Sequence, residues 1–539
     1  MSRHNDRVAL AGTALLATLV TGSALAATHY AKPLAHPVGA PQSLAQRMSV
    51  SALAATRSAW TPLTNQQNFI DGAANPILLT DGSVLVQDAG FPDWWKLTPD
   101  QSGSYINGTW SQVASTPAFY SPLYHSTAVL PDGRMIIEGG EYLLSLDQTQ
   151  LVPSWTAQGA IYDPVADTWT MVAPPTFFPY FGTEQTIGDA QSVVLADGTF
   201  MQANCCTNQA ALLDPLTLTW TSAGTGKFDI NDEEGWTLLP NRKVLAVDAY
   251  VGSYDPAVTG SELYNARTKT WSSAGSTVTQ LWDSAADCGG GAVASYEVGP
   301  GVLRPDGTVF YTGANACAAA HTAIYNSRRG TWSAGPDFPD GLGIADGPAA
   351  LEPNGKVLMM ASPGVFSTPS VFLEWDGRNL KEIAGPPNAA IDSSFYGNML
   401  VLPTGQILLT DFSNDIEIYT PASGEQESEN DPRIYAAPSQ VRRGNSYRVI
   451  GRGFNGMSQG AAYGDDAQAA TNFPLVRITN NRTGHVFYAR THDHSSMAVA
   501  SEDTVSTTFD VSSAQERGAS VLQVIVNGHA SQKLPITVQ

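Results

Sequence analysis

Side chains able to do acid–base or metal chemistry recur at one position relative to a repeated hairpin turn. Five of the seven turns contain an Asp-Gly or Asn-Gly pair, which suits loops that need positive φ. Eight residues before each turn, or one residue further back for Glu297, stand Tyr124, Asp189, Glu233, Glu297, Asp346 and Tyr396. Carboxylates that converge bind a divalent cation or raise one another's pKa, and both outcomes suit general acid–base work. We therefore assign Asp189, Glu233, Asp346, Tyr396, Tyr124 and the adjacent His125 as candidate catalytic residues. The alternative is a set of solvated loop acids in an acidic protein.

Two histidines near the C-terminus have the spacing of a metal pair. His492 and His494 stand two residues apart in "ARTHDHSSM". On a strand such residues point to the same face, so they are candidate metal ligands. Alternatively, His494 forms a hydrogen bond within its own domain.

Aromatic residues recur in another set of loops, each of which follows the second strand of a repeated unit. The residues expected to form a rim around the acidic position are Trp94, Trp95, Tyr142, Tyr250 and Tyr254, with Phe366. Flat aromatic faces beside carboxylates suit a carbohydrate, whose C–H faces stack while its hydroxyls form hydrogen bonds. The same side chains would otherwise fill the cores of the loops.

The elements that position these residues belong to a repeat with seven members. A strand, a turn and a second strand recur as "PILLTDGSVLVQ", "STAVLPDGRMIIE", "SVVLADGTFMQA", "WTLLPNRKVLAV", "GVLRPDGTVFYT", "AALEPNGKVLMM" and "NMLVLPTGQILLT". In most units a second hairpin follows and ends in tryptophan, as in "IYDPVADTWT". Units of four short strands predict an all-β fold, a seven-bladed kelch-like β-propeller over residues 57–424. The last unit lacks its tryptophan strand, so we expect the N-terminal strand around Trp60 to complete it.

The repeat ends near residue 432, and alternating strands without the blade motif follow. They predict an immunoglobulin-like β-sandwich over residues 432–539. A propeller followed by such a sandwich, together with "YHSTAVLPDGRMIIEGG" at residues 124–140, resembles the galactose oxidase and glyoxal oxidase family. The resemblance implies a copper radical oxidase, which converts an alcohol or aldehyde to an aldehyde or acid and releases hydrogen peroxide. It also implies that His492, on a sandwich loop, reaches up the propeller axis to the metal.

Several residues depart from that family's pattern. The Tyr-His pair of the family begins the inner strand of the last blade, whereas Tyr124-His125 begins that of the second unit. In the last unit Tyr396 is followed by Gly397, and no cysteine stands where the radical tyrosine's partner is expected. Most of the copper site is therefore missing from the sequence.

Composition and the N-terminus predict where the protein works. Arg3 and Arg7, a short apolar run and Ala24-Leu25-Ala26 predict a signal peptide over residues 1–26, followed by a flexible leader over residues 27–56. We expect a secreted or periplasmic protein with no membrane span after cleavage, most simply a monomer. A formal net charge of −21 argues against a nucleic-acid partner.

Four cysteines fit an oxidising compartment. Cys288 and Cys317 are expected on neighbouring loops of one face, and we predict a disulfide between them. The adjacent Cys205 and Cys206 either form a vicinal disulfide or remain free thiols.

Three functions remain compatible with the sequence. The first is a secreted galactose-oxidase-like propeller that binds or processes a carbohydrate or other small polar ligand at an acidic, aromatic-rimmed channel mouth. Its cofactor is unknown, with copper and calcium as the candidate divalent metals. The second is a true copper-dependent radical oxidase, and the third is a non-catalytic envelope or adhesion protein.

Overall fold

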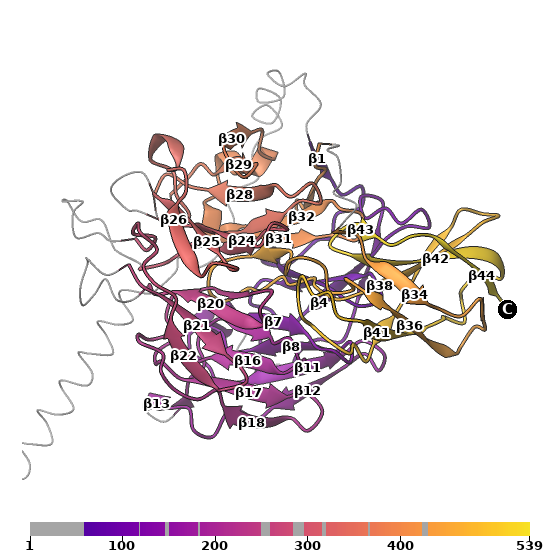
Figure 1. Cartoon of the computed structure of the whole chain (residues 1–539), viewed down its shortest axis with the longest axis horizontal. Coiled ribbons are helices and arrows are strands. Elements are labelled where there is room, and N and C mark those ends of the chain that lie inside the picture. Colours follow the sequence, from indigo (N-terminus) through magenta and orange to yellow (C-terminus); the bar gives the residue numbers. More distant parts are fainter. Residues whose placement is uncertain are drawn as a thin grey trace, which may run out of the picture.

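The computed structural model describes residues 59–117, 119–145, 150–181, 184–249, 259–283, 296–314, 320–364, 367–422 and 430–539. The described residues form an all-β protein built from many short strands (Figure 1). Several predictions fall outside the described residues: the signal peptide and leader, the Cys288–Cys317 disulfide, and Tyr250, Tyr254 and Phe366 of the aromatic rim. Within the described part, no helix has the length and apolar character needed to cross a membrane.

Among the described residues, seven antiparallel sheets of the repeat follow one another along the chain, each with four strands of its own. The sheet that begins with β27 gains a fifth strand, and the last sheet takes its fourth strand from the N-terminal part of the chain. Sheet 1 contains β2 (Ala73–Leu78), β3 (Val84–Asp88), β4 (Trp94–Thr98) and β5 (Thr109–Gln112). Sheet 2 contains β7 (Ser126–Val129), β8 (Met135–Glu138), β11 (Gly159–Asp163) and β12 (Thr168–Val172). Sheet 3 contains β15 (Ser192–Val194), β16 (Phe200–Ala203), β17 (Ala210–Asp214) and β18 (Thr219–Ser222). Sheet 4 contains β19 (Trp236–Leu238), β20 (Lys243–Val247), β21 (Ser261–Asn265) and β22 (Thr270–Ser273).

The remaining sheets repeat this plan. Sheet 5 contains β23 (Gly301–Leu303), β24 (Thr308–Thr312), β25 (Thr322–Asn326) and β26 (Thr331–Ala334). Sheet 6 contains β27 (Ala349–Leu351), β28 (Val357–Ala361), β29 (Val371–Trp375) and β30 (Leu380–Ile383). Sheet 7 contains β31 (Asn398–Val401), β32 (Ile407–Thr410), β33 (Glu417–Tyr419) and β1 (Trp60–Pro62). Small additions are β6 (Pro122–Leu123), β9 (Tyr142–Leu144), β10 (Leu151–Pro153), β13 (Tyr180–Phe181), β14 (Glu184–Gln185) and the 3-10 turns η2 (Pro339–Gly341), η3 (Pro387–Ala390) and η4 (Ser394–Tyr396).

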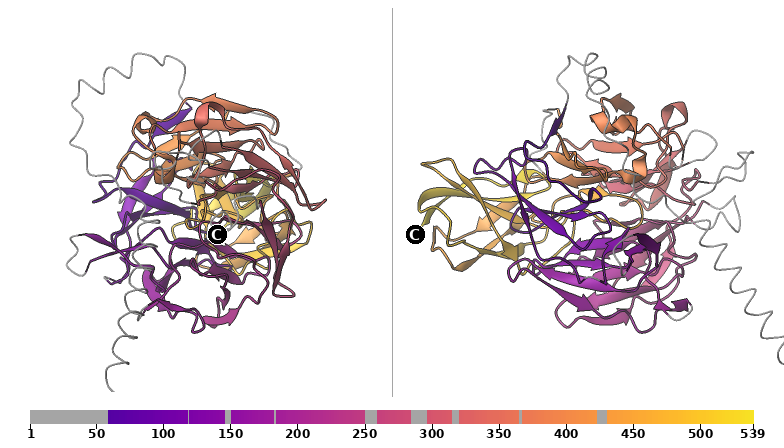
Figure 2. Two further views of the ribbon diagram at one scale, coloured as in Figure 1. Left: turned by 90° about the vertical axis from the view of Figure 1, so that its left-hand side faces the viewer. Right: turned by 180° about the vertical axis from the view of Figure 1, so that it is seen from behind.

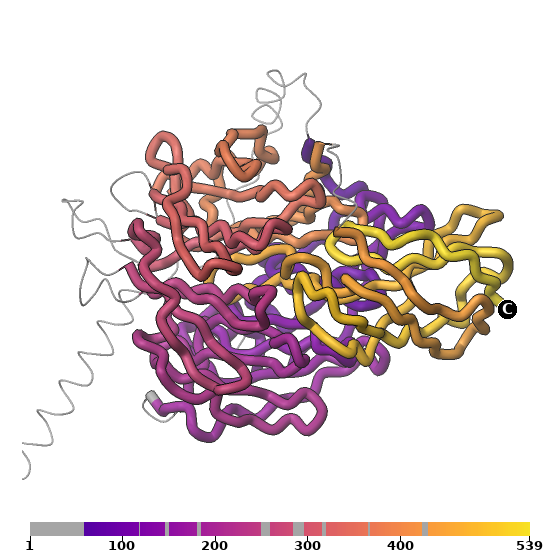
Figure 3. Tube along the Cα trace, viewed as in Figure 1, coloured from indigo at the N-terminus to yellow at the C-terminus, as the bar shows by residue number. Residues whose placement is uncertain are grey.

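The first strands of the seven sheets lie side by side around a centre. Each first strand contacts the next one around the ring, in the order β2, β7, β15, β19, β23, β27 and β31, and β31 in turn contacts β2. The end-on view in Figure 2 shows the sheets arranged around that centre. The N-terminal strand β1 pairs with β33, with Trp60 opposite Tyr419, and the tube in Figure 3 shows this indigo strand beside the orange end of sheet 7. The first strands are fully buried and the fourth strands are largely exposed, so the core lies toward the centre of the ring.

The repeated tryptophan explains why neighbouring sheets stay together. The indole N–H of Trp169 donates to the carbonyl of Ala114, just past the fourth strand of the preceding sheet, at 2.7 Å. Trp220 donates in the same way to Ala173, and Trp60 to Ala384. Each of these buried or partly buried indoles thereby satisfies its one donor while its ring packs between two sheets.

The C-terminal residues form two further sheets that pack on each other. One contains β34 (Arg433–Ala436), β36 (Ser446–Arg452), β41 (Val505–Asp510) and β40 (Thr491–His492). The other contains β35 (Gln440–Val441), β44 (Leu534–Val538), β42 (Gly518–Val526), β38 (Leu475–Asn480) and β39 (Val486–Ala489), with β43 (His529–Ala530) beside β42. A separate apolar cluster fills the space between them. Backbone hydrogen bonds from Thr491 to Thr80, His494 to Pro131 and Met497 to Ala196 hold this domain against the hairpin turns of sheets 1 to 3.

One segment of the C-terminal domain, residues 457–472, leaves the two sheets and lies among the first strands of the ring. We call it the axial segment. Its short strand β37 (Ala461–Ala462) pairs with β27, and the carbonyl of Gln468 accepts a hydrogen bond from the Thr127 hydroxyl at 2.8 Å. The side chain of Gln459 accepts from the backbone N–H of Leu238 at 2.7 Å. The axial segment therefore contacts strands on several sides of the ring.

Candidate functional site

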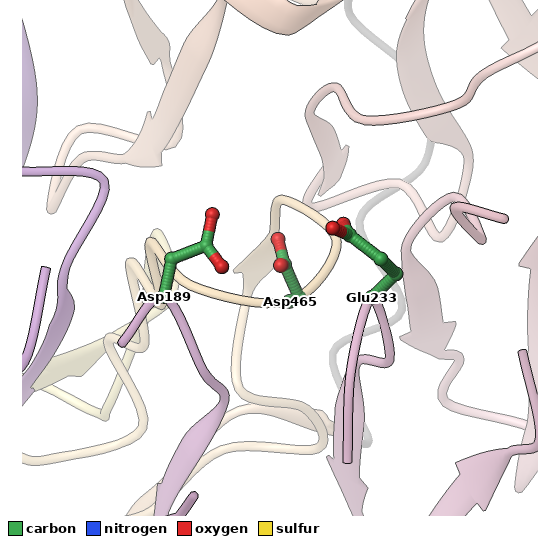
Figure 4. Close-up of side chains that lie close together, drawn as sticks. All are labelled: Asp189, Glu233 and Asp465. Atoms are coloured by element: carbon green, nitrogen blue, oxygen red, sulfur yellow. The ribbon is translucent and has the colours of Figure 1, made fainter. Parts of the chain in front are cut away.

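Buried carboxylates meet at the end of the ring where each sheet begins. Oxygen atoms of Asp189, Glu233 and Asp465 lie within 4.8 Å of one another, and so do those of Glu233, Glu297 and Asp346. Figure 4 shows the side chains of Asp189, Asp465 and Glu233 pointing toward one another. None of the five side chains is more than 5% exposed. We call these five residues the carboxylate cluster.

The connections between sheets position four members of the cluster. Asp189, Glu233, Glu297 and Asp346 come shortly before β15, β19, β23 and β27, the first strands of sheets 3 to 6. Gly188 precedes Asp189 with φ of 74°, and Glu233 itself has φ of 59°, a left-handed conformation that costs energy for a residue with a side chain. These turns direct the carboxylates toward the axis.

Asp465 comes from the other domain and was not predicted. The axial segment brings it to the cluster by a close backbone approach: a Cβ added to Gly235 would lie 2.2 Å from the carbonyl oxygen of Gly464. Only glycine leaves room at that crossing. No local pattern in "YGDDAQ" indicates this position, because it depends on how the two domains pack.

A second group of buried charges adjoins the cluster through Glu234, the residue after Glu233. The ammonium group of Lys227 pairs with Glu234 at 3.0 Å and Glu262 at 2.9 Å, with Asp248 at 4.0 Å, and with Asp229. Burial alone would lower the pKa of Lys227, but the four carboxylates outweigh it and raise that pKa well above its usual value. Burial, followed by the neighbouring Asp229, raises the pKa of Asp248 to about 8 and that of Glu234 far above its usual range. No spacing in the sequence indicates this lysine group, because packing brings Asp248 and Glu262 to Lys227.

Tyr124, His125 and Tyr396 lie together on another part of the ring, at the start of sheets 2 and 7. The rings of Tyr124 and Tyr396 both contact Phe412, with centroids 6.1 and 6.0 Å away. The Nε2 atom of His125 lies 2.8 Å from Oε1 of Gln87, and burial lowers the His125 pKa to about 4, so the imidazole is neutral. A cavity of about 20 Å³ lies beside Tyr124 and His125 and is also lined by Tyr463 and Asp466 of the axial segment. That volume suits about one water molecule.

The structure differs from the predicted aromatic rim at Trp94 and Tyr142. Trp94 is 0% exposed and Tyr142 is 2% exposed, and Trp95 is only partly buried. Trp94 packs against Trp169 at 5.3 Å, and Tyr142 contacts Tyr124 at 6.1 Å. Trp94 and Tyr142 therefore fill the cores of neighbouring sheets and loops, which was the alternative stated for them.

His494 forms a hydrogen bond within its own domain, which was the alternative to its role as a metal ligand. His492 lies between Asp493 and Asp510, at 2.9 and 3.1 Å, and His494 bonds to the hydroxyl of Thr507 at 2.8 Å. Burial, followed by the charge of His492, lowers the His494 pKa to about 3. Both histidines lie at the hairpin-turn end of the ring, away from the carboxylate cluster, and each has its own partners. The axial segment, not the loop around His492, enters the ring.

The two adjacent cysteines form a disulfide between Cys205 and Cys206. The backbone N–H of Cys205 donates to the carbonyl of Ile187, and a Cβ added to Gly188 would lie 2.5 Å from the Cys205 sulfur. The disulfide therefore packs directly against the turn that carries Asp189.

Comparison with known proteins agrees with the repeat. The chain is 29% identical over 147 residues to the Kelch-like protein terF of Aspergillus terreus, a match that covers 26% of this chain and 27% of that protein. The chain resembles kelch-type propellers. It matches about a quarter of that relative's length, and no protein-family model matches it.

Two solved structures are similar to this chain at low identity and with TM-scores below 0.5. A fungal alcohol oxidase of the AA5 family, in complex with copper, has 13% identity and a TM-score of 0.48, and the match covers 89% of this chain and 99% of that one. Virginiamycin B lyase from Staphylococcus aureus has 7% identity and a TM-score of 0.44 over 67% of this chain and 99% of that one.

The residues present do not fit a copper radical centre. Among the residues that the structure describes, every group with the spacing of metal ligands consists of carboxylates alone. His125 is bonded to Gln87, and His492 lies at the other end of the ring. Oxygen-only ligand sets favour Ca²⁺, Mg²⁺ or Mn²⁺, whereas copper prefers imidazole and sulfur.

Proposed function

We propose that the protein is an exported, monomeric seven-bladed kelch-like propeller with an immunoglobulin-like sandwich, and that its carboxylate cluster binds a carbohydrate or other small polar ligand with the help of a hard divalent cation. The sheets described above would be the blades, and the C-terminal domain would be the sandwich. The protein would work outside the cytoplasm, as its N-terminal sequence indicates.

The observation that carries this proposal is the meeting of Asp465 with Asp189 and Glu233 inside 4.8 Å. Five carboxylates from two domains share one buried region, where Coulomb repulsion is stronger than in water. A divalent cation relieves that repulsion and uses carboxylate oxygens as ligands. Calcium fits best of the candidate metals, because it accepts many oxygen ligands in flexible geometry.

A carbohydrate is the ligand class that these groups suit. Sugar hydroxyls complete the coordination of a calcium ion and donate hydrogen bonds to the remaining carboxylate oxygens. The C-terminal domain covers the hairpin-turn end of the ring, so a ligand would approach from the end where the connections lie. The large negative net charge disfavours acidic ligands.

Isothermal titration with calcium, magnesium, zinc and copper chlorides tests the proposal. We expect the parent to bind calcium, and Asp465→Asn to weaken that binding at least tenfold, because one ligand and one charge are lost. Asp493→Asn is the matched control, since Asp493 is an exposed aspartate at the other end of the ring, and it should bind calcium like the parent. A parent protein that binds none of the four cations would overturn the proposed cation site.

A further inference from the structure

Exposed apolar side chains are concentrated on one set of segments. In the described part of the chain, seven of the ten large exposed hydrophobic residues lie on the connections that lead from one sheet to the next. They are Ile70, Phe119, Phe177, Tyr180, Phe228, Val278 and Ile391. The other three lie in strand hairpins, at Val165 and Leu216, or in the C-terminal domain, at Tyr435. The connections lie at the end of the ring that holds the carboxylate cluster, opposite the C-terminal domain.

The aromatic members occupy three successive connections, those leading into sheets 2, 3 and 4. Phe119 is 56% exposed, Phe177 38%, Tyr180 63% and Phe228 70%. We call these four residues the aromatic arc. Figure 1 shows β13, which contains Tyr180, on the side of the ring opposite the C-terminus.

The same connections carry the polar residues of the centre. Phe119 stands five residues before Tyr124, and Phe228 stands five residues before Glu233. Phe177 and Tyr180 precede Asp189 on the connection into sheet 3. Each connection therefore exposes an aromatic ring first and then directs a polar side chain toward the axis.

Specific contacts hold the arc in place. The backbone N–H of Phe228 donates to both carboxylate oxygens of Glu262, at 3.0 and 3.1 Å, and Glu262 pairs with the buried Lys227. The ring of Phe177 packs edge-on against the buried Phe178, with centroids 5.5 Å apart. The lysine group thus fixes a segment that bears both an exposed ring and Glu233. Anchored, exposed aromatic rings are typical of binding surfaces.

We propose that the aromatic arc binds a neutral or amino-substituted polysaccharide chain and leads it to the carboxylate cluster. This inference rests on the proposed function for its ligand class and adds that the ligand is a polymer. The four rings stand on three successive connections, so a ligand that contacts all of them must be longer than a single sugar. The net charge of −21 disfavours acidic glycans and anionic lipid surfaces, whereas C–H faces of neutral sugars stack on aromatic rings.

Calorimetric titration with cello- and chito-oligosaccharides of two, four and six units tests the inference, first with calcium present and then after its removal. We expect affinity in the parent to rise with chain length, by about fivefold for each ring engaged. Phe177→Ala and Phe228→Ala should each remove part of this gain, and the double variant most of it, while calcium affinity stays unchanged. Leu216→Ala is the control, because Leu216 is 81% exposed but lies in the hairpin between β17 and β18 at the other end of the ring.

The outcomes separate this inference from the proposed function. Oligosaccharide affinity that is independent of chain length would overturn the polysaccharide inference alone. Calcium binding without any oligosaccharide binding would overturn that inference and also contradict carbohydrate as the ligand of the cluster. Length-dependent binding that is unaffected by calcium removal and by Asp465→Asn would support the arc and contradict the cation site. Concentration-dependent dimerisation or co-sedimentation with neutral phosphatidylcholine vesicles, lost in the Phe177→Ala/Phe228→Ala variant, would replace the polysaccharide with a second copy or a lipid surface.

Discussion

Two parts of the ring entrance occupy the same position of the repeat and differ in chemistry. Sheets 3 to 6 contribute Asp189, Glu233, Glu297 and Asp346, while sheets 2 and 7 contribute Tyr124 and Tyr396. The first part gathers ionisable oxygens around Asp465, and the second packs tyrosine rings around Phe412. Two adjacent residues of the axial segment lie one in each part. Asp465 belongs to the carboxylate cluster, and Asp466 lines the small cavity beside Tyr124. The repeated backbone position therefore fixes where a side chain lies, and the residue type decides whether that position carries an ionisable carboxylate or an aromatic ring.

The acidic part, taken together with the lysine group that adjoins it, should be far more sensitive to charge changes, and Lys227→Met tests this most strongly. The substitution leaves four buried carboxylates without their cation. Removing one partner from a buried ion pair costs about 3–5 kcal/mol, and we expect a loss of that size in the free energy of unfolding measured with urea. Lys381→Met, at an exposed position on β30, is the control and should change stability by less than about 0.5 kcal/mol. Equal stability of the two variants would contradict the assigned role of Lys227.

Gly235→Ala should have the next largest effect, because it separates the acidic part from the axial segment. The new Cβ would overlap the Gly464 carbonyl, so the segment carrying Asp465 must shift. We expect a loss of about 1–3 kcal/mol in stability and weaker calcium binding by titration. Gly355→Ala has positive φ and open space around its Cβ, so it should lower stability while calcium binding is unchanged. Normal calcium affinity in Gly235→Ala would show that the close crossing is not needed.

The two parts should respond to pH in opposite directions, and Asp248→Asn tests the acidic one. Because burial raises the pKa of folded Asp248 to about 8, the folded protein retains a proton that the unfolded chain releases. The contribution of this proton to the free energy of unfolding is complete below the unfolded pKa near 4. It is lost as pH rises through about 8, at a rate of at most about 1.4 kcal/mol per pH unit. Urea unfolding between pH 5 and pH 8 should show a smaller decline in Asp248→Asn than in the parent. Parallel curves would rule out this titration.

His125→Gln tests the tyrosine part and should give the smallest effect. Folded His125 has its pKa lowered to about 4, so the unfolded chain binds a proton first as the solution is acidified. Its contribution is present above the unfolded pKa of about 6.5 and is lost as pH falls toward 4. We expect the free energy of unfolding, measured with urea, to fall less in the variant than in the parent between pH 6.5 and pH 4.5. Above pH 7 the two curves of stability against pH should run parallel. A difference confined to alkaline pH would contradict the buried, neutral histidine.

Local sequence determined the strands and the positions of the four sheet-borne carboxylates. Turn residues such as Gly82 and Gly133 have positive φ, and an Asp-Gly pair in the sequence predicts such a turn. The apolar segments on either side of these turns predict antiparallel hairpins, and the structure has them. Since Asp189, Glu233 and Asp346 stand at a constant distance from those turns, their place at the start of an inner strand could be read from the sequence. The vicinal Cys205 and Cys206 were also visible there, although their oxidation state was not.

Tertiary structure alone decided which segment enters the ring and which aromatic residues face solvent. Asp465 joins the cluster because β37 pairs with β27 and the C-terminal domain packs on the hairpin turns, and neither contact has a local signature. Trp94 and Tyr142 were expected at the surface and are buried, whereas Phe119 and Phe228 are exposed on connections without a strand pattern. Burial of a side chain depends on what neighbouring sheets cover, which is a property of contacts between residues distant in the chain. Local turn chemistry therefore placed the backbone, and packing between sheets and domains placed the fifth carboxylate and the aromatic surface.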